Sequence, residues 1–321
     1  MKLEFSIKQH KASNFKGFLY LLTPLILMSI GIYLSVVSAA WSFYFVLGQI
    51  LLGIFFFQCF ILLHETGHFS YFNNRILNKI FGHLFAFISF IPLSSWIEIH
   101  NLHHKWTGYR DKDPTTEGTL NPAFGTFTKF LINASWLLWI PLFTIGYRLG
   151  NYWKPTKLKK HLSKQVLPAV YRNMAAQLLL YAILLFFFGR WIFQHLAVGY
   201  LFSLIISDLF ILSQHSHIEI PIAGEKDVKP IRYTEQIPYT RSLALLKYVG
   251  RFIYFNFNLH ELHHAYPGLP AYYLDAIKDE TPNKVNFFNY LFDAKKMSGM
   301  DFIFKTSQKK IGSKPTGKLK T

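Results

Sequence analysis

Two apolar stretches that follow one another near the start of the chain constrain its fold more than any other feature. Residues 17–40 and 41–63 are each long enough to cross a lipid bilayer as a helix, which takes about 20 apolar residues. Residues 175–188, lengthened by 170–174, and residues 191–212 form a second such pair. Apolar residues make up 51% of the 321, a high share for a soluble protein. The sequence therefore predicts an all-α, multi-pass membrane protein with about four transmembrane helices.

Two other regions are apolar but do not fit a full span. Polar residues, among them Asn78, Lys79 and His83, interrupt residues 76–97. Residues 131–147 are too few to cross the bilayer. Both regions are expected to form interfacial or re-entrant helices.

The basic residues predict how the chain is oriented. Lysines and arginines gather before residue 17, between residues 148 and 172, and after residue 304, whereas the two opposite connections hold only Arg190. Because basic loops stay on the cytoplasmic side, both termini are expected there. The net charge of +17 lies mainly in these flanking segments, where it meets anionic lipid headgroups, so a nucleic-acid partner is not expected.

The single cysteine, Cys59, lies inside the second predicted span. A disulfide framework and a cysteine-based metal site are therefore excluded, and any metal must be held by histidine or carboxylate. Residues 1–321 are expected to form one domain, with a core at about 17–300 and a polar, basic tail at about 306–321. The first apolar segment is expected to remain as an anchor, because a second span follows it directly.

Ten of the 14 histidines occur in four short motifs. These are His64 and His68 in HETGH, His100, His103 and His104 in HNLHH, His215 and His217 in QHSH, and His260, His263 and His264 in HELHH. In a helix, positions i, i+3 and i+4 lie on one stripe, so HETGH, HNLHH and HELHH are each expected to aim their imidazoles one way.

The predicted spans bring all four motifs to the cytoplasmic face. Many imidazoles with few carboxylates suit iron, copper, nickel or zinc. One ion cannot use nine or ten nitrogens, so two metal ions are expected. His10, His83, His161 and His195 stand apart and are expected to have no metal role.

Several nearby residues leave alternatives open. His215 is preferred to His217 as a ligand, since neighbours two apart point to different sides of a helix. Asp208 lies two turns before His215 and either orients an imidazole or pairs with a buried amide. Glu65 and Glu261 either accept the second N–H of a metal-bound imidazole or lie in solvent.

The combined pattern resembles the three histidine boxes of the membrane fatty acid desaturase superfamily, with QHSH as the additional histidine between the second and third boxes. The agreement includes Thr107 and Asp113-Pro114 after HNLHH, and Pro270 with Tyr272 after HELHH. It extends over roughly residues 63–274.

This resemblance implies a four-span fold with a cytoplasmic cap, two non-haem irons, and insertion of a double bond into an acyl chain with O2 and two electrons. The implied metal ligands are His64, His68, His100, His103, His104, His215, His260, His263 and His264. Relatives acting on acyl-CoA have an asparagine one turn before the intermediate histidine. Ile211 occupies that position here, so acyl-CoA is not the expected substrate and water can replace one ligand. The HELHH motif and the PGLPAYYL segment after it resemble bacterial and plant-type enzymes that act on acyl groups in lipids, so such a group is the expected substrate.

Electrons are expected from an external carrier, a ferredoxin or small cytochrome, docked on the basic loops around Lys157, Lys159 and Lys160. Two alternatives remain. One is a di-iron hydroxylase of a carotenoid, sterol or alkane, for which the ligands would be the same. The other is an intramembrane zinc metalloprotease, because residues 64–68 and residues 260–264 both fit H-E-x-x-H.

Overall fold

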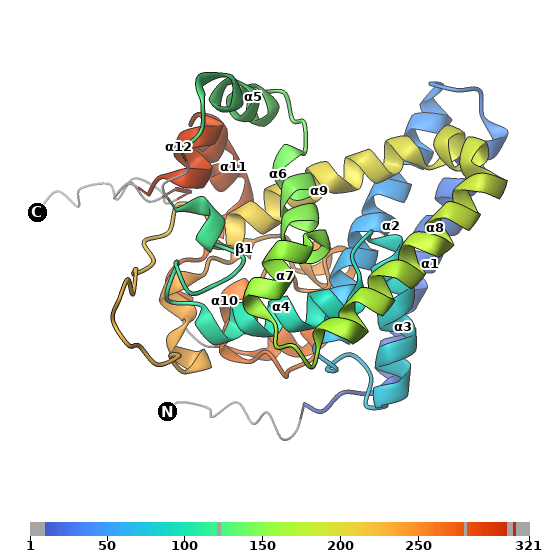
Figure 1. Ribbon diagram of the computed structural model, residues 1–321. Helices are drawn as coiled ribbons and strands as arrows, with labels where there is room; N and C mark the ends of the chain where they lie inside the picture. The colour runs from blue at the N-terminus through green and yellow to red at the C-terminus, as the bar shows by residue number, and fades with distance from the viewer. Residues whose placement is uncertain (1–9, 121–122, 279–280, 307–310, 313–321) are drawn as a thin grey trace, which may run out of the picture.

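The computed structural model describes residues 10–120, 123–278, 281–306 and 311–312 (Figure 1). The helices are α1 (Asn14–Val37), α2 (Phe43–Gly67), α3 (Arg75–Ile88), α4 (Leu93–Trp106), α5 (Thr126–Leu137), α6 (Leu142–Arg148), α7 (Pro155–His161), α8 (Leu167–His195), α9 (Ala197–His215), α10 (His260–Ala265), α11 (Phe287–Lys295) and α12 (Gly299–Phe304). Two short strands, β1 (Leu243–Ala244) and β2 (Val285–Asn286), pair in parallel, Leu243 opposite Val285. Single turns of 3-10 or π-helix lie at Glu117–Thr119, Leu149–Trp153, Tyr233–Glu235, Ile237–Tyr239, Val249–Ile253 and Ala271–Ala276.

Four helices, α1, α2, α8 and α9, are long and apolar enough to cross a membrane, which confirms the predicted all-α membrane fold. The predicted boundary between the third and fourth membrane helices, at residues 188–191, lies too early in the sequence. Helix α8 continues through Gly189 and Arg190 and ends at His195, so Arg190 lies in a helix rather than in a connection. Its exposed side chain lets the helix continue, since a long basic residue near a helix end can reach the interface.

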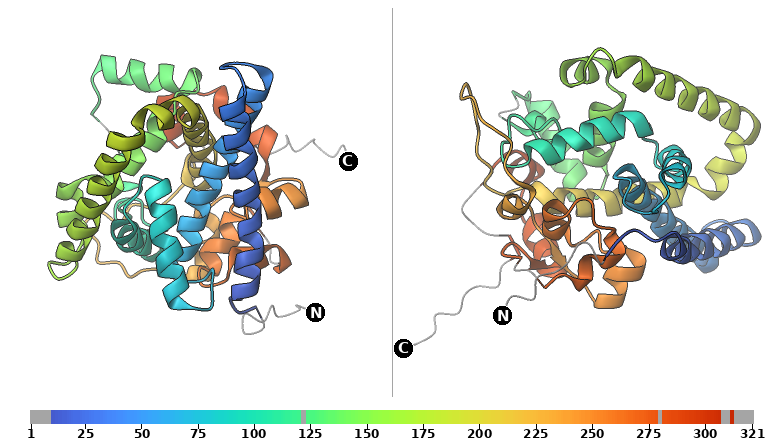
Figure 2. Two further views of the ribbon diagram at one scale, coloured as in Figure 1. Left: turned by 90° about the vertical axis from the view of Figure 1, so that its right-hand side faces the viewer. Right: turned by 90° about the horizontal axis from the view of Figure 1, so that it is seen from below.

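Helix α2 is the centre of the bundle. It packs against α1, α3 and α9, and its span is 67% buried, whereas the span of α8 is only 6% buried and faces lipid. The left view of Figure 2 shows α1 and α8 on opposite sides of the molecule for most of their length, and they meet at the end where His195 of α8 contacts Ser35 of α1. The end of α2 therefore delivers its last residues, which include His64, to the interior of the protein.

The two regions expected to be interfacial or re-entrant are sharply bent helix pairs. Helices α3 and α4 meet at 98°, and α5 meets the α6 segment at 114°. Each break contains a proline, Pro92 or Pro141, and the residue two positions before it, Phe90 or Trp139, has a positive φ. Proline cannot continue a helix and biases the residue before it away from helical backbone, which explains the position of both bends.

A buried arginine fixes the bends relative to the membrane helices. The guanidinium of Arg148, at the end of α6, donates to the carbonyl of Ser89 at the first bend and to the hydroxyl of Ser207 in α9. The bend after α3 turns α4 across the end of α2. Helix α4 therefore presents HNLHH to the end of α2 that carries HETGH (Figure 1).

Most of the predicted polar tail lies outside the described residues. Of its described positions, Ile311 is buried and the amide of Gly312 donates to Asp293 of α11.

Candidate metal centre

Four elements bring the histidine motifs to one place. His64 and His68 lie at the end of α2, His100, His103 and His104 in the second half of α4, His215 at the last residue of α9, and His260, His263 and His264 in the short helix α10. Two groups of ring nitrogens result, each within 4.8 Å: His64, His68, His100, His104 and His263 form the five-histidine group, and His103, His215, His260 and His264 form the four-histidine group. These are the nine residues that the sequence singled out.

The expectation that each motif aims its imidazoles one way was wrong for HNLHH and HELHH. His100 and His104 join the five-histidine group, whereas His103 joins the other. In HELHH, His263 belongs to the five-histidine group, whereas His260 and His264 belong to the four-histidine group. Positions i and i+4 stay together, but i+3 points about 100° away from i+4, which is enough to reach a second centre. The two motifs thus link the two groups.

The spacing of the ring nitrogens fits metal ions at the two centres. Nε2 of His100 lies 3.0 Å from Nε2 of both His68 and His104, and Nε2 of His104 lies 3.1 Å from that of His263. In the second group Nε2 of His260 lies 2.9 Å from that of His215. Imidazole nitrogens about 2.1 Å from one ion and 90° apart would be separated by about 3 Å.

Four of the opposite ring nitrogens are held from outside, whereas the Nδ1 atoms of His104 and His260 have no hydrogen-bond partner in the described part of the chain. Nδ1 of His64 lies 3.0 Å from the Glu65 carboxylate, and Nδ1 of His103 lies 2.7 Å from that of Asp113. A carbonyl of Tyr239 and the amide oxygen of Gln236 accept from Nδ1 of His215 and His264. An N–H donated outward leaves the lone pair of Nε2 directed inward, as metal binding requires. The Nε2 atoms of His64 and His264 have no hydrogen-bond partner among the described residues.

Burial favours the neutral form of four rings outside the membrane spans. It lowers the pKa of His68 to about 3, with further lowering by the neighbouring His64, and it lowers the pKa of His260, His263 and His264 well below the ordinary value. Neutral imidazole is the form that binds a metal ion. Burial alone would raise the pKa of Asp113, but attraction to and hydrogen bonding with His103, and the Thr115 amide, give a pKa below the usual range.

The acidic residues fall into distinct roles. Glu65 is buried, and its second oxygen accepts from the backbone of Ala271, so it joins the α2 motif to the segment after α10. Glu261 was expected to hold an imidazole or lie in solvent, and it does neither: it is buried and accepts from the amides of Ser242 and Asn283. Asp208 accepts from the backbone amide of Thr144, which is the second of its two predicted roles.

The remaining histidines lie outside both groups. His217 has a left-handed backbone, with φ of 55°, and its Nδ1 donates to the carbonyl of Lys305. His161 contacts Glu117, and His195 contacts Ser35.

Three residues that help build the centre were not identified from the sequence. Gln236 holds His264 while donating to the carbonyl of His104. Thr115 hydrogen-bonds to both Nδ1 of His103 and Asp113. Trp96 stacks on His100, with ring centroids 4.3 Å apart. Trp96 lies one turn before His100 in the same helix and was thus detectable, whereas Gln236 has no signal in the sequence.

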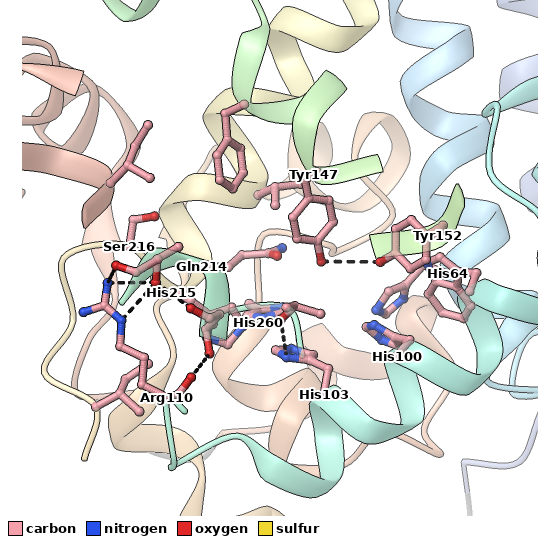
Figure 3. Close-up of a pocket in the computed structure, with 18 of the residues that line it drawn as sticks. His64, His100, His103, Arg110, Tyr147, Tyr152, Gln214, His215, Ser216 and His260 are labelled. Carbon is pink, nitrogen blue, oxygen red and sulfur yellow. Dashed lines mark hydrogen bonds between the residues drawn. The ribbon is translucent and has the colours of Figure 1, made fainter. Parts of the chain in front are cut away.

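A small pocket of about 60 Å³ adjoins the histidines (Figure 3). His64, His100 and His103 line one side, and Tyr147 and Gln214 lie across from them. The pocket therefore gives a small reacting group access to both histidine groups.

Comparison with known proteins places this arrangement in a family. The profile of the family described as "Fatty acid desaturase" matches residues 39–293. An sn-1 oleoyl-lipid 12-desaturase of Picosynechococcus sp. is 25% identical over 282 residues, 83% of this chain and 76% of that protein. An sn-2 acyl-lipid omega-3 desaturase (ferredoxin), chloroplastic, of Helianthus annuus is 24% identical over 265 residues, 78% of this chain and 58% of that protein.

A third relative, an omega-3 fatty acid desaturase of Caenorhabditis elegans, is 28% identical over 120 residues, 35% of this chain and 30% of that protein. The chain thus spans less than two thirds of two of these three relatives. The family profile, however, covers most of the chain and all nine grouped histidines. This chain belongs to the fatty acid desaturase family.

Proposed function

We propose that this protein is an oxygen-dependent desaturase that inserts a double bond into a fatty acyl chain of a membrane lipid, with two iron ions held by the nine grouped histidines. The observation that carries the proposal is the pair of adjacent groups of imidazole nitrogens, each group within 4.8 Å. Two neighbouring nitrogen-rich centres suit two transition-metal ions.

The reaction removes one hydrogen from each of two adjacent methylene carbons. With O2, two electrons and two protons from outside, it yields the alkene and two molecules of water. Bound iron supplies the activation of oxygen needed to oxidise an unactivated C–H bond. The chain's own residues orient the imidazoles through Glu65, Asp113 and Gln236, and they hold the acyl chain beside the histidines and exclude water.

The names of the relatives support a lipid-linked substrate. Those of the Picosynechococcus and Helianthus proteins specify an oleoyl-lipid and an acyl-lipid. Ile211, which lines the pocket, adds no polar ligand to the four-histidine group, so that group has room for water as a further ligand.

Electrons come from an external carrier, a ferredoxin or a small cytochrome. The Helianthus relative is named for ferredoxin. Of the three lysines expected to dock an acidic carrier, Lys159 and Lys160 are exposed, although Lys160 also pairs with Glu117, whereas Lys157 is largely covered and lies 3.6 Å from the same carboxylate. Reversing the charge of Lys159 and Lys160 should therefore slow turnover and raise the KM for the carrier. Unchanged kinetics would contradict docking of the carrier at these two lysines.

The test of the function is a lipid profile. Cells expressing the wild type in the presence of O2 should accumulate an additional unsaturated acyl species, which gas chromatography detects. Cells expressing a protein with both His263→Ala and His264→Ala should not. A hydroxylated lipid in place of the alkene would support the hydroxylase, and no new lipid from an iron-loaded wild type would contradict both.

The geometry disfavours the zinc protease. In such an enzyme the glutamate of H-E-x-x-H acts as the general base beside the metal. Here Glu65 contacts the outward nitrogen of His64 and the backbone of Ala271. Glu65 therefore contacts His64 on the side of the ring opposite Nε2, and it does not line the pocket.

A further inference from the structure

A second, larger cavity adjoins the histidine pocket. It has a volume of about 350 Å³, within the about 300–1,000 Å³ typical of ligand sites, whereas the histidine pocket is too small for more than the reacting part of a chain. The two share five lining residues: Thr115, Thr119, Phe143, Tyr147 and Ile303. A molecule in the larger cavity can therefore extend into the smaller one.

The larger cavity lies between the bent pair α5–α6 and helix α12, which packs against α5 (Figure 1). Its outer lining includes Ile140 and Leu142, at the bend, whose side chains are 50% and 41% exposed. Leu137 and Leu138 beside them are 68% and 65% exposed. In a membrane protein such an exposed apolar rim is expected to face lipid, so this side of the cavity opens to the bilayer, whereas Lys157 lines another part of its wall.

Two glycines leave the wall of this cavity open. Gly146 and Gly150 both line it, one turn apart on the α6 segment. No described atom outside their local backbone lies within 4 Å of a Cβ built on either. Glycine weakens a helix interior by about 1 kcal/mol relative to alanine. Because no described neighbour requires the absence of a Cβ, packing within the protein does not explain why these two positions are glycine.

We propose that the cavity between α5, α6 and α12 is the binding site for the acyl chain of a bilayer glycerolipid, which enters sideways at the bend around Ile140 and passes Gly146 to reach the histidines. This deepens the proposed function and rests on it. The one carboxylate among the cavity's described lining residues, that of Asp208, is already hydrogen-bonded to the Thr144 amide. Apolar Trp136, Phe143 and Ile303 complete the path.

The structure provides a matched control cavity. Another apolar groove, lined by α8, α9 and the first bend, is also exposed to lipid, but among the described residues it shares none with the histidine pocket. Gly189 lines that groove, and the nearest atom to a Cβ built there, in Leu185, is 3.9 Å away. Gly146→Leu and Gly189→Leu are therefore the same substitution in two lipid-facing cavities, of which only one leads to the site.

The first experiment measures turnover and iron content of both variants. Gly146→Leu should lower turnover at least tenfold with wild-type iron content, Gly146→Ala should have a smaller effect, and Gly189→Leu should match the wild type. Wild-type turnover in an iron-loaded Gly146→Leu protein would overturn the proposal. If Gly146→Leu does not fold, the Ala variant decides: full activity in it counts against the path.

The second experiment needs neither iron nor activity, so it can fail separately from the proposed function. Protein in nanodiscs containing phosphatidylcholine with a diazirine in the middle of one acyl chain is irradiated and digested. Label should appear on Trp136 and Ile303, which are each only 6% exposed, and should be lost in Gly146→Leu but not in Gly189→Leu. Absence of label at these residues would overturn the proposal, as would loss of label when excess acyl-CoA of the same chain is added.

Discussion

His103 and His104 are neighbours in α4, yet their rings belong to different histidine groups. Adjacent positions in a helix point about 100° apart, and the contacts of the two residues fix this separation. Asp113 and Thr115 hold Nδ1 of His103, whereas the carbonyl of His104 accepts from Gln236, the residue that also holds His264. At the scale of single residues, the centre therefore depends on acceptors outside the rings as much as on the imidazoles.

Replacing Asp113 tests this dependence. Asp113→Asn keeps an acceptor near His103 but removes its charge, so the ring is oriented less firmly and is less basic. We expect iron to bind the four-histidine group about 10–100-fold more weakly, the usual effect of losing such a partner. Titration of the protein with a competing chelator measures this.

Asp111→Asn is the matched control, because Asp111 accepts from the loop amides of Ala223 and Gly224. It should bind iron like the wild type. Equal affinity in Asp113→Asn and the wild type would show that Asp113 does not support the site.

At the scale of elements, the crossing of α2 and α4 positions the five-histidine group. Gly67 allows the crossing, since a Cβ there would lie 2.1 Å from an atom of the Trp96 ring. Trp96 is almost fully buried and stacks on His100, so it cannot move without disturbing a histidine.

Gly67→Ala should therefore both destabilise the protein and weaken iron binding. Overpacking a core typically costs about 1–3 kcal/mol, which thermal unfolding in detergent would show as a lower Tm. Gly125→Ala, where a new Cβ meets no described atom within 4 Å, should leave both properties unchanged. A wild-type Tm and iron content in Gly67→Ala would mean that the helices do not approach as closely as described.

Much of this arrangement could be predicted from the sequence, because span length and histidine spacing are local properties. The four membrane helices and the grouping of nine histidines followed from these patterns. The division of HNLHH between two groups could not be predicted from the sequence. The roughly 100° between His103 and His104 leads to two groups only because α9 and α10 supply the other histidines of the four-histidine group. The cavity at α5–α6 likewise depends on how a bend at Pro141 packs against α12, which lies about 160 residues later.

At the scale of the whole molecule, the four candidate membrane helices are even in number, so the segments before α1 and after α9 would lie on the same side of the membrane. We propose the cytoplasmic side, from the basic residues that flank the spans. Cysteines placed one at a time at Lys11 and Ser38, with Cys59 replaced by serine, test this in intact cells. A membrane-impermeant thiol reagent should label the Ser38 variant only, and labelling of the Lys11 variant instead would reverse the orientation.

The central claim is that the nine histidines form two metal centres, one in each group. His263 and His264 are adjacent in sequence but belong to different groups, so elemental analysis of His263→Ala and His264→Ala, each alone, tests it most directly. The wild type should hold about two irons per chain, and each variant should lose about one. One zinc and no iron in the wild type, or no loss of iron in either variant, would contradict the account.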